Sequence, residues 1–483
     1  MSTSSAAAST PGAGAAPARG VTGLAITAAL GGLLFGFDSS VINGATGAIR
    51  ESFEPGSFLL GTAVASALLG SAVGAWYAGR IADRFGRPPT MVITALLFAV
   101  SAVGSAISFS IWDLILWRVI GGIAIGSASV IAPAYIGEIS PARLRGRLGS
   151  LQQLAIVLGI FAALLSDYGL AQLAGGAGEE LALGMDAWRW MFLVGILPAA
   201  LYGLLALRLP ESPRHLVVAG DLDEARVQLE RYVGGDVDHR LAEIQRTVSH
   251  ERKTGFRDLL GGRFGFLPIV WTGIAISMFQ QLVGINVIFY YSTELWQSVG
   301  FSESDALLIG VITSVTNIVT TIVAIFFIDR IGRRRLLMAG SAGMAVSLGT
   351  MAVMFAGAVV KGDAVTLEGG AGTVALVAAN VFVFSFGASW GPAIWVLLGE
   401  MFPNRIRTIG LAVAAAMQWI TNFAVSQSFP ILSDIGLQFA YGLYAIFAVL
   451  SGLFVWRALQ ETNGRELEDM DDDPVPATAV ATG

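Results

Sequence analysis

Long apolar runs alternate with short polar segments along most of the 483-residue chain. A helix that crosses the hydrocarbon core of a bilayer needs about 20 mostly apolar residues. Six such runs precede a longer polar segment and six follow it, so the pattern predicts an all-α membrane protein with twelve transmembrane helices in two six-helix halves. The runs begin near Val21, Phe58, Thr90, Asp113, Leu148, Trp188, Phe264, Ala306, Leu336, Thr373, Ile406 and Ile435.

The polar segments divide the chain into five expected parts. Residues 1–20 are rich in Ala, Ser, Pro and Gly, which is typical of a disordered tail and not of a cleaved signal peptide. Residues 21–208 and 264–458 are the two expected helix bundles. Residues 209–263 are expected to form short cytoplasmic helices, with Asp221 or Asp223 as an N-cap. Residues 459–483 form the C-terminal tail.

The composition supports a membrane location and excludes several classes of protein. Hydrophobic residues make up 54% of the chain and charged residues 13%, which is about half the charged share of a soluble domain. There is no cysteine, so disulfides and thiolate metal sites are excluded. The three histidines lie in or beside the central polar segment. We therefore expect no metal, no cofactor, no nucleic acid partner and no enzymatic activity.

The basic residues indicate the orientation of the chain in the membrane. Of the 29 Lys and Arg residues, all but Arg50, Arg118, Arg189 and Lys361 fall in tails or loops on one face of the predicted bundle. Cytoplasmic loops carry an excess of Lys and Arg. The asymmetry predicts a multi-pass protein of the cell (inner) membrane with both termini in the cytoplasm.

Two charged motifs occur once in each half, on the predicted cytoplasmic face. Asp83-Arg84-x-Gly86-Arg87 is repeated at residues 329–333, and Gly137-Glu138-x-x-Pro141-x-Arg143-x-Arg145 is repeated at residues 399–407. Parallel six-helix repeats are typical of major facilitator transporters. Such charges can simply fix helix orientation, but acidic residues paired with arginine favour a conformational latch that holds this face closed. The expected latch residues are Asp83, Arg84, Arg87, Glu138, Arg145, Glu211, Arg214, Asp329, Arg330, Arg333, Glu400 and Arg407.

Outside the two tails, the chain resembles the sugar porter family of the major facilitator superfamily. The resemblance rests on motifs in the family's order: residues 79–87, Arg118-x-x-Gly121-Gly122, Pro210-Glu211-Ser212-Pro213-Arg214, Gln280-Gln281-x-x-Gly284-x-Asn286, Gly391-Pro392-x-x-Trp395 and Glu461-Thr462-x-Gly464. It is similar to bacterial glucose permeases and to the xylose–proton symporter. Pro88-Pro89, Gln460 and Asn463 depart from the family pattern. The resemblance implies the major facilitator fold and a carrier that works by alternating access.

A sugar site needs groups that both donate and accept hydrogen bonds, beside aromatic platforms. Polar side chains inside spans usually face the bundle interior, although they can also hold helices together. The spacing of Gln281 and Asn286 does not keep them on one helical face, so a distortion is expected beside Gly284. The resemblance implies a substrate-binding set of Gln153, Gln280, Gln281, Asn286, Tyr290, Asn317, Phe386, Trp395, Gln418, Trp419 and Asn422. Gln152 and Trp390 are weaker candidates, and Tyr290 and Tyr291 are candidate gating residues.

Asp38 and Arg118 are candidates for coupling transport to a proton. Asp38 lies within an apolar run, where a carboxyl group is driven to take up a proton unless it is paired. If Arg118 faces it, the carboxylate is ionised while paired and is released by protonation; the alternative is a static structural pair. The resemblance implies symport, because proton-coupled sugar porters carry Asp at the position of Asp38, in a motif that reads Gly36-Phe37-Asp38 here.

The sequence therefore predicts a monosaccharide–proton symporter, with glucose as the preferred substrate. A proton-independent sugar facilitator and a symporter of xylose, arabinose or inositol are the alternatives. A sugar sensor is disfavoured because the tail after Gly464 is short. The expected partners are the sugar, the proton and the lipid bilayer, and the expected oligomeric state is a monomer.

Overall fold

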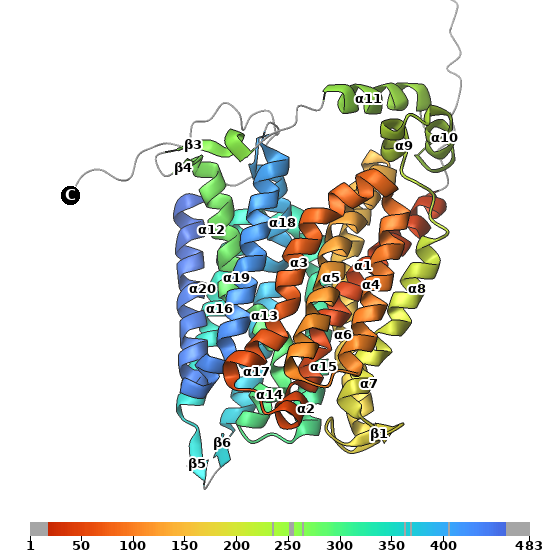
Figure 1. The fold of residues 1–483 in the computed structure, drawn as a ribbon. Helices are drawn as coiled ribbons and strands as arrows, with labels where there is room; N and C mark the ends of the chain where they lie inside the picture. Colours follow the sequence, from red (N-terminus) through yellow and green to blue (C-terminus); the bar gives the residue numbers. More distant parts are fainter. Residues whose placement is uncertain are drawn as a thin grey trace, which may run out of the picture.

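A computed structural model describes residues 18–233, 236–250, 256–262, 265–361, 364–367, 370–403 and 406–459. Twelve helical segments within these residues are long and apolar enough to cross a membrane. They begin at or near the twelve predicted positions, so the predicted fold class is confirmed. In Figure 1 the spans stand side by side in one bundle, and the chain colours separate the first half from the second.

The first half is built from eight helices that make six spans. Spans one and six are each interrupted, between α1 and α2 and between α7 and α8. The helices are α1 (Ala18–Ser40), α2 (Ile42–Phe53), α3 (Ser57–Phe85), α4 (Arg87–Ala106), α5 (Ile111–Ile139), α6 (Ala142–Ala174), α7 (Ala187–Val194) and α8 (Ile196–Ala206). A short hairpin of β1 (Glu180–Ala182) and β2 (Met185–Asp186) joins α6 to α7.

Short helices connect the halves. These are α9 (Pro213–Ala219), α10 (Leu222–Gln228) with a π-helical turn (Leu229–Val233), α11 (Val237–His250) and a 3-10 turn (Phe256–Leu259). Asp221 is the N-cap of α10 and accepts a hydrogen bond from the Glu224 backbone N–H, as predicted. A hairpin of β3 (Leu260–Gly262) and β4 (Gly265–Phe266) precedes the second half.

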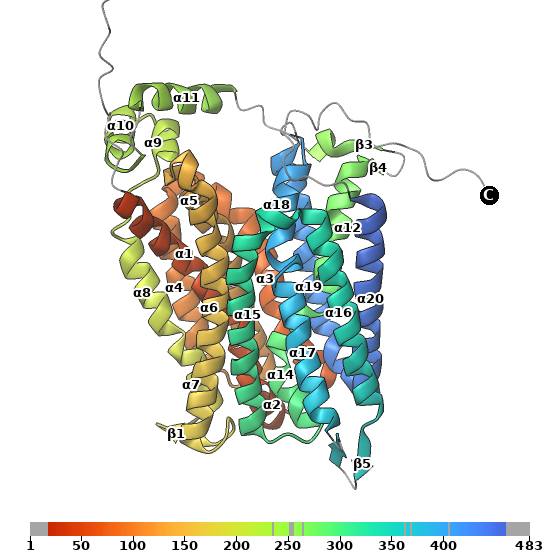
Figure 2. The ribbon, with the colours of Figure 1, turned by 180° about the vertical axis from the view of Figure 1, so that it is seen from behind.

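The second half contains the remaining six spans. Spans seven and ten are interrupted, between α12 and α13 and between α17 and α18. Its elements are α12 (Pro268–Leu282), α13 (Ile285–Tyr290), α14 (Ser292–Ser298), α15 (Glu303–Ile331), α16 (Arg333–Ala356), β5 (Val359–Lys361), β6 (Ala364–Thr366), α17 (Ala371–Gly387), α18 (Trp390–Met401), α19 (Arg407–Ile435) and α20 (Leu437–Ala458). Figure 2 shows α9 to α11 at one end of the bundle, here called the linker end, and α2 and α14 toward the opposite end, here called the α2 end. Helix α1 begins and α20 ends at the linker end (Figures 1 and 2).

Glycines set the distance between α3 and α5. A Cβ atom at Gly70 would lie 2.2 Å from the Val119 carbonyl oxygen, and one at Gly74 would lie 2.1 Å from that of Ile123. On the facing helix α5, a Cβ atom at Gly122 or Gly126 would lie 2.0 Å from a backbone carbonyl oxygen of α3. Each pair is separated by three residues, which is the small-residue spacing that lets membrane helices pack backbone to backbone.

The same device holds α1 against α6. A Cβ atom at Gly36 would lie 2.0 Å from the Ile156 carbonyl oxygen, and one at Gly159 would lie 2.1 Å from that of Leu33. Close packing at Gly36 fixes the height and rotation of α1 two residues before Asp38. Gly36 and the facing Gly159 therefore help to determine which way the Asp38 carboxylate points.

Candidate functional site

Asp38 and Arg118 meet in the interior of the first half, as the sequence predicts. The guanidinium Nη1 of Arg118 donates to Oδ2 of Asp38 over 3.0 Å and to its backbone carbonyl oxygen over 2.9 Å. Arg118 is 1% exposed and Asp38 is 9% exposed. Gly121, one turn after Arg118, leaves room for the carboxylate, since a Cβ atom there would lie 3.3 Å from Asp38 Oδ2. The pair is thus a desolvated ion pair with a close-fitting surround.

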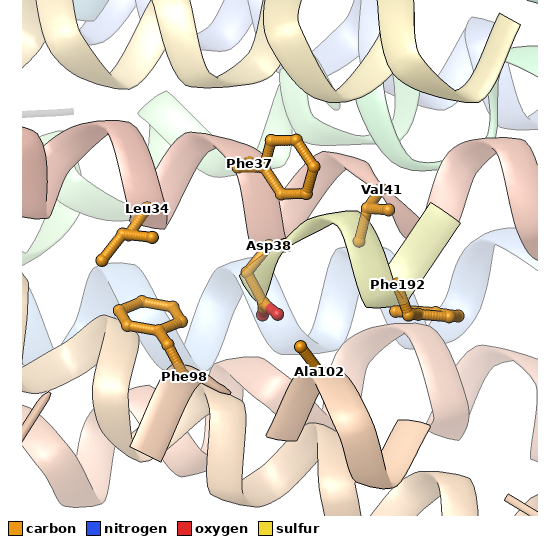
Figure 3. A pocket seen from close by; sticks show the side chains of 8 residues that line it. Leu34, Phe37, Asp38, Val41, Phe98, Ala102 and Phe192 are labelled. Atoms are coloured by element: carbon orange, nitrogen blue, oxygen red, sulfur yellow. The ribbon is translucent and has the colours of Figure 1, made fainter. Parts of the chain in front are cut away.

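A small cavity adjoins this pair. It is lined by Asp38 together with apolar side chains and one glycine: Leu34, Phe37, Val41, Phe98, Ala102, Phe192 and Gly195. Figure 3 shows the Asp38 carboxyl group directed toward Phe98 and Ala102 of α4. Gly195 also marks the interruption between α7 and α8. The carboxylate therefore faces a space at which one helix is already broken.

Four of the predicted sugar-site amides form one hydrogen-bonded network. Asn286 donates to the Gln281 side-chain oxygen over 2.6 Å, and Gln281 donates to that of Gln280 over 3.4 Å. Gln418 of α19 also donates to the Gln280 oxygen, and Gln280 donates to the Trp390 carbonyl oxygen over 3.1 Å. The network joins spans seven, ten and eleven. Amide groups arranged in this way can exchange their mutual hydrogen bonds for bonds to a polyhydroxy ligand.

The predicted distortion of span seven is confirmed. Gly284 has φ +80°, a left-handed conformation that favours glycine, and it separates α12 from α13. The turn brings Asn286 back toward Gln281. It also leaves Tyr290 buried beside Asn422 of α19 and Ser39 of α1, with which its hydroxyl interacts. Tyr290 thus lies between the predicted sugar-site residue Asn422 and Ser39, the residue that follows Asp38.

The remaining predicted sugar-site residues lie on five helices. Trp419 of α19 packs against Phe35 of α1 with ring centroids 5.7 Å apart, so it contacts the opposite half. Asn317 of α15 lies beside Gly387 of α17, next to Phe386. Gln153 is half-buried in α6, and Trp395 is 45% exposed on α18. The weaker candidate Trp390 is buried and donates to the Leu337 carbonyl, which is a packing role.

At the linker end, the predicted latch residues of the first half converge on Arg87. Its guanidinium donates to both oxygens of Glu138, over 3.0 and 2.9 Å, and contacts Asp83 over 3.3 Å and His215 Nδ1 over 3.0 Å. The Glu211 carboxylate accepts from the Arg87 backbone N–H over 3.0 Å. Arg84 is exposed beside Phe85. These contacts join α3, α4, α5 and the linker, all on the first-half side.

The second half repeats one of these contacts. Arg333 donates to Glu400 over 2.8 Å, joining α16 to α18 as Arg87 joins α4 to α5. Arg214 lies on α9, at the same end of the bundle. The side chains of Arg145, Asp329, Arg330 and Arg407 lie outside the described part of the structure. A link between the two halves through the latch residues stays a prediction.

The α2 end carries contacts between the halves that the sequence did not single out. Arg50 of α2 pairs with Glu294 of α14, and Thr293 donates its backbone N–H to Asn43 over 3.0 Å. Three more contacts cross the same end: Glu303 to Ala177, Ser304 to Gln172, and Asp434 to Ser57. Burial raises the pKa of Glu294, and Arg50 offsets only part of that rise. This end of the bundle is closed.

Asp167 was also missed. It lies within the fifth span, and its side chain is 0% exposed. Ionisable residues inside spans are rare and usually functional, and that rule alone would have found it. Among the described residues, no group of three or more His, Cys, Asp or Glu side chains could hold a metal ion.

Two parallel six-span halves, a closed end, a buried acid–arginine pair and a central amide network define a membrane carrier of the major facilitator type. The Sugar (and other) transporter family matches residues 24–473, and the chain belongs to this family.

Known relatives align with nearly the whole chain. The glucose transport protein of Synechocystis sp. is 57% identical over 445 residues, covering 92% of this chain and 95% of its own. The D-xylose-proton symporter of Escherichia coli K12 is 35% identical over 482 residues, covering 93% and 94%. The inward-open structure of the xylose transporter XylE from E. coli aligns with a TM-score of 0.79 and 34% identity, covering 93% of this chain and 99% of that one.

Proposed function

We propose that this protein is a proton-coupled monosaccharide symporter and that glucose is its substrate. The observation that carries the proposal is the buried Asp38–Arg118 pair, which lies in the half opposite to the amide network. Ser39, next to Asp38, interacts with Tyr290, which also interacts with the predicted sugar-site residue Asn422. The 57% identity to a glucose transport protein supports glucose over a pentose. The proton-symporting relative at 35% identity supports the coupling.

The positions of the charges support one orientation in the membrane. The basic residues gather at the linker end, which we place in the cytoplasm together with both termini. The α2 end then faces outward, and the structure corresponds to a carrier closed to the outside. Its similarity to an inward-open xylose transporter supports this assignment. In this state the bound sugar would contact Gln280, Gln281, Asn286 and Gln418 and would leave toward the linker end.

Protonation of Asp38 would drive the cycle. An ion pair removed from water is tolerated because the two charges compensate each other, whereas an unpaired charge at the same place is costly. When the carboxylate takes up a proton, the side-chain part of its contact with Arg118 weakens. Helix α1 can then shift past Tyr290, which touches both the sugar-site residue Asn422 and Ser39 of α1. The proton and the sugar are thereby linked through one tyrosine.

Uptake of labelled glucose tests both parts of the proposal. The protein is expressed in a bacterium that lacks its own glucose carriers, and uptake is measured with and without a protonophore. We expect accumulation against the gradient, its loss with the protonophore, and competition by unlabelled glucose that exceeds competition by galactose, xylose, arabinose or inositol. Equilibration without accumulation would make the protein a facilitator, and stronger competition by xylose would make it a pentose carrier.

A further inference from the structure

Asp167 of α6 is an acidic side chain that the coupling pair does not use. It is fully buried, and neither carboxyl oxygen has a hydrogen-bond partner among the described residues. The backbone amide of Gly44 on α2 approaches it without the geometry of a hydrogen bond. An ionised carboxylate in such a place loses its hydration and gains only the poorly aligned Gly44 amide in return. The surroundings therefore suit the neutral carboxylic acid.

The helices packed around Asp167 carry charged groups, but these are engaged elsewhere or exposed. Arg50 of α2 pairs with Glu294, Arg118 of α5 pairs with Asp38 of α1, and Arg189 of α7 donates to the Ala106 and Ser108 carbonyls. Glu51 of α2 is exposed, and on α15 Glu303 accepts from Ala177 while Asp305 accepts from Ser302. Among the described side chains of these neighbouring helices, no cation is left to neutralise an ionised Asp167.

The close fit between α2 and α6 shields this carboxyl group from solvent. A Cβ atom at Gly44 would lie 2.6 Å from Asp167 Cβ and 2.8 Å from its Oδ2. The adjacent residue, Asn43, is the one that accepts from the Thr293 backbone N–H at the closed α2 end. Hydrating Asp167 requires α2 to move away from α6, and this movement pulls Asn43 away from α14. The charge on Asp167 and closure of the α2 end therefore oppose each other.

We propose that Asp167 is a second proton-binding site, which must be protonated for the α2 end to close. The site takes a proton from the outside medium when α2 and α14 are apart, and it keeps that proton while the end is closed. Because the closed end seals Asp167 from both solutions, the proton returns with the carrier and is not delivered to the cytoplasm. This inference rests on the proposed function for its direction, since the α2 end is taken as the outer end.

Infrared spectroscopy of the reconstituted protein tests the protonation state. We expect the wild type at neutral pH to show a protonated-carboxyl C=O band that is absent from D167N and present in E51Q, which removes the nearby exposed carboxyl group on α2. Asn matches Asp in size, so D167N preserves the packing on Gly44. A spectrum in which D167N and the wild type have the same carboxylic-acid band would overturn the proposal. This readout does not depend on any transported sugar.

Transport provides the second readout. Glucose counterflow is measured with equal pH on the two sides of the vesicle, over a series of pH values. If closure of the loaded carrier requires a proton on Asp167, the counterflow rate falls in alkaline medium. The requirement for this one proton lowers the rate by up to about tenfold per pH unit. We expect the pH dependence of D167N to be less steep by one proton and that of E51Q to equal the wild type. The number of protons moved per sugar should be the same in the wild type, D167N and E51Q. An unchanged pH profile in D167N, or a lower proton-to-sugar ratio, would contradict the proposal. Absence of glucose counterflow in every variant would instead contradict the proposed substrate.

Discussion

One nitrogen of Arg118 holds Asp38 at two points, the carboxylate oxygen over 3.0 Å and the backbone carbonyl oxygen over 2.9 Å. Protonation neutralises the first acceptor and leaves the second intact. Arg118 therefore stays attached to α1 throughout, and only the charge-dependent part of the contact changes. This geometry suits a protonation switch better than a static ion pair. When Asp38 takes up a proton, the buried Arg118 still keeps the backbone carbonyl oxygen as an acceptor.

Replacement of Asp38 by Asn removes the charge and keeps the shape of the side chain. Because the backbone contact with Arg118 remains, we expect D38N to lose uphill glucose accumulation and to retain counterflow exchange. Both are measured in vesicles with and without an imposed proton gradient. Asp113→Asn, which lies near the α2 end of α5, the helix that carries Arg118, is the control and should accumulate glucose normally. Accumulation by D38N at the wild-type level would rule out Asp38 as the coupling group.

Gly121 provides a second test of the same pair. In Gly121→Ala the new methyl group would lie 2.5 Å from Ser101 Oγ and 3.3 Å from Asp38 Oδ2. Such overpacking costs about 1–3 kcal/mol, so we expect a lower melting temperature and a greater loss of accumulation than of counterflow. Gly137→Ala, in the same helix with nothing within 4 Å, is the control. Equal melting curves for the two variants would show that the pair tolerates displacement.

The amide network is expected to bind the sugar and not merely to hold helices together. Gln280→Leu removes the acceptor shared by Gln281 and Gln418 and a group that can bond to a sugar hydroxyl. At about 0.5–1.5 kcal/mol for a hydrogen bond, the KM for glucose should rise about 2- to 13-fold. Asn380→Leu is the control, because Asn380 joins α17 to α15 by accepting from Thr316. A role in helix packing alone would give both variants the same loss of stability and an unchanged KM.

Sequence periodicity was sufficient to find the spans, since a bilayer requires long apolar helices whatever their tertiary contacts. The Asp38–Arg118 contact was predictable for a related reason: a buried charge in a span needs a partner, and few candidates exist. The left-handed Gly284 was signalled by the five-residue spacing of two polar side chains. Each of these predictions follows from a constraint that acts within one helix or on one rare residue type.

The contacts at the α2 end were not predictable in the same way. Arg50 and Glu294 lie 244 positions apart, and Asn43 and Thr293 lie 250 apart. Polar residues near span ends are common, because water is available to them. Only the packing of the two halves decides which of them meet. The same limit applies at the linker end. A motif alone does not reveal which state of the carrier it stabilises, and in this structure the contacts of Arg87 stay within one half.

The Arg87 cluster supports a prediction about stability. Arg87 is largely buried and contacts two carboxylates, whereas Arg84 in the same motif is exposed. Removing one partner of a buried ion pair costs about 3–5 kcal/mol, because the other charge is left uncompensated. We expect Arg87→Gln to lower the melting temperature strongly and Arg84→Gln to change it little. Thermal unfolding in detergent compares the two, and equal effects would mean that the motif acts through its total charge.

The Arg50–Glu294 pair makes closure of the α2 end sensitive to pH. Burial raises the pKa of Glu294 above its ordinary 4.5, and the opposing effect of Arg50 is smaller. A carboxyl group whose pKa is higher in the closed state binds its proton more tightly there. Its contribution to closure is therefore complete below pH 4.5 and is lost as the pH rises through the raised value.

Spin labels can measure this closure directly, because the chain has no cysteine of its own. Labels at Phe109→Cys and Ile435→Cys lie on exposed positions of the two halves, 82% and 62% exposed in the native residues. We expect the short inter-label distance to become more populated as the pH falls, and this response to be smaller in E294Q. E51Q, which removes an exposed carboxyl group on α2, should respond as the wild type does. If E294Q retained the full response, Glu294 would not be the titrating group, and the pH dependence of closure would lie with Asp167 alone.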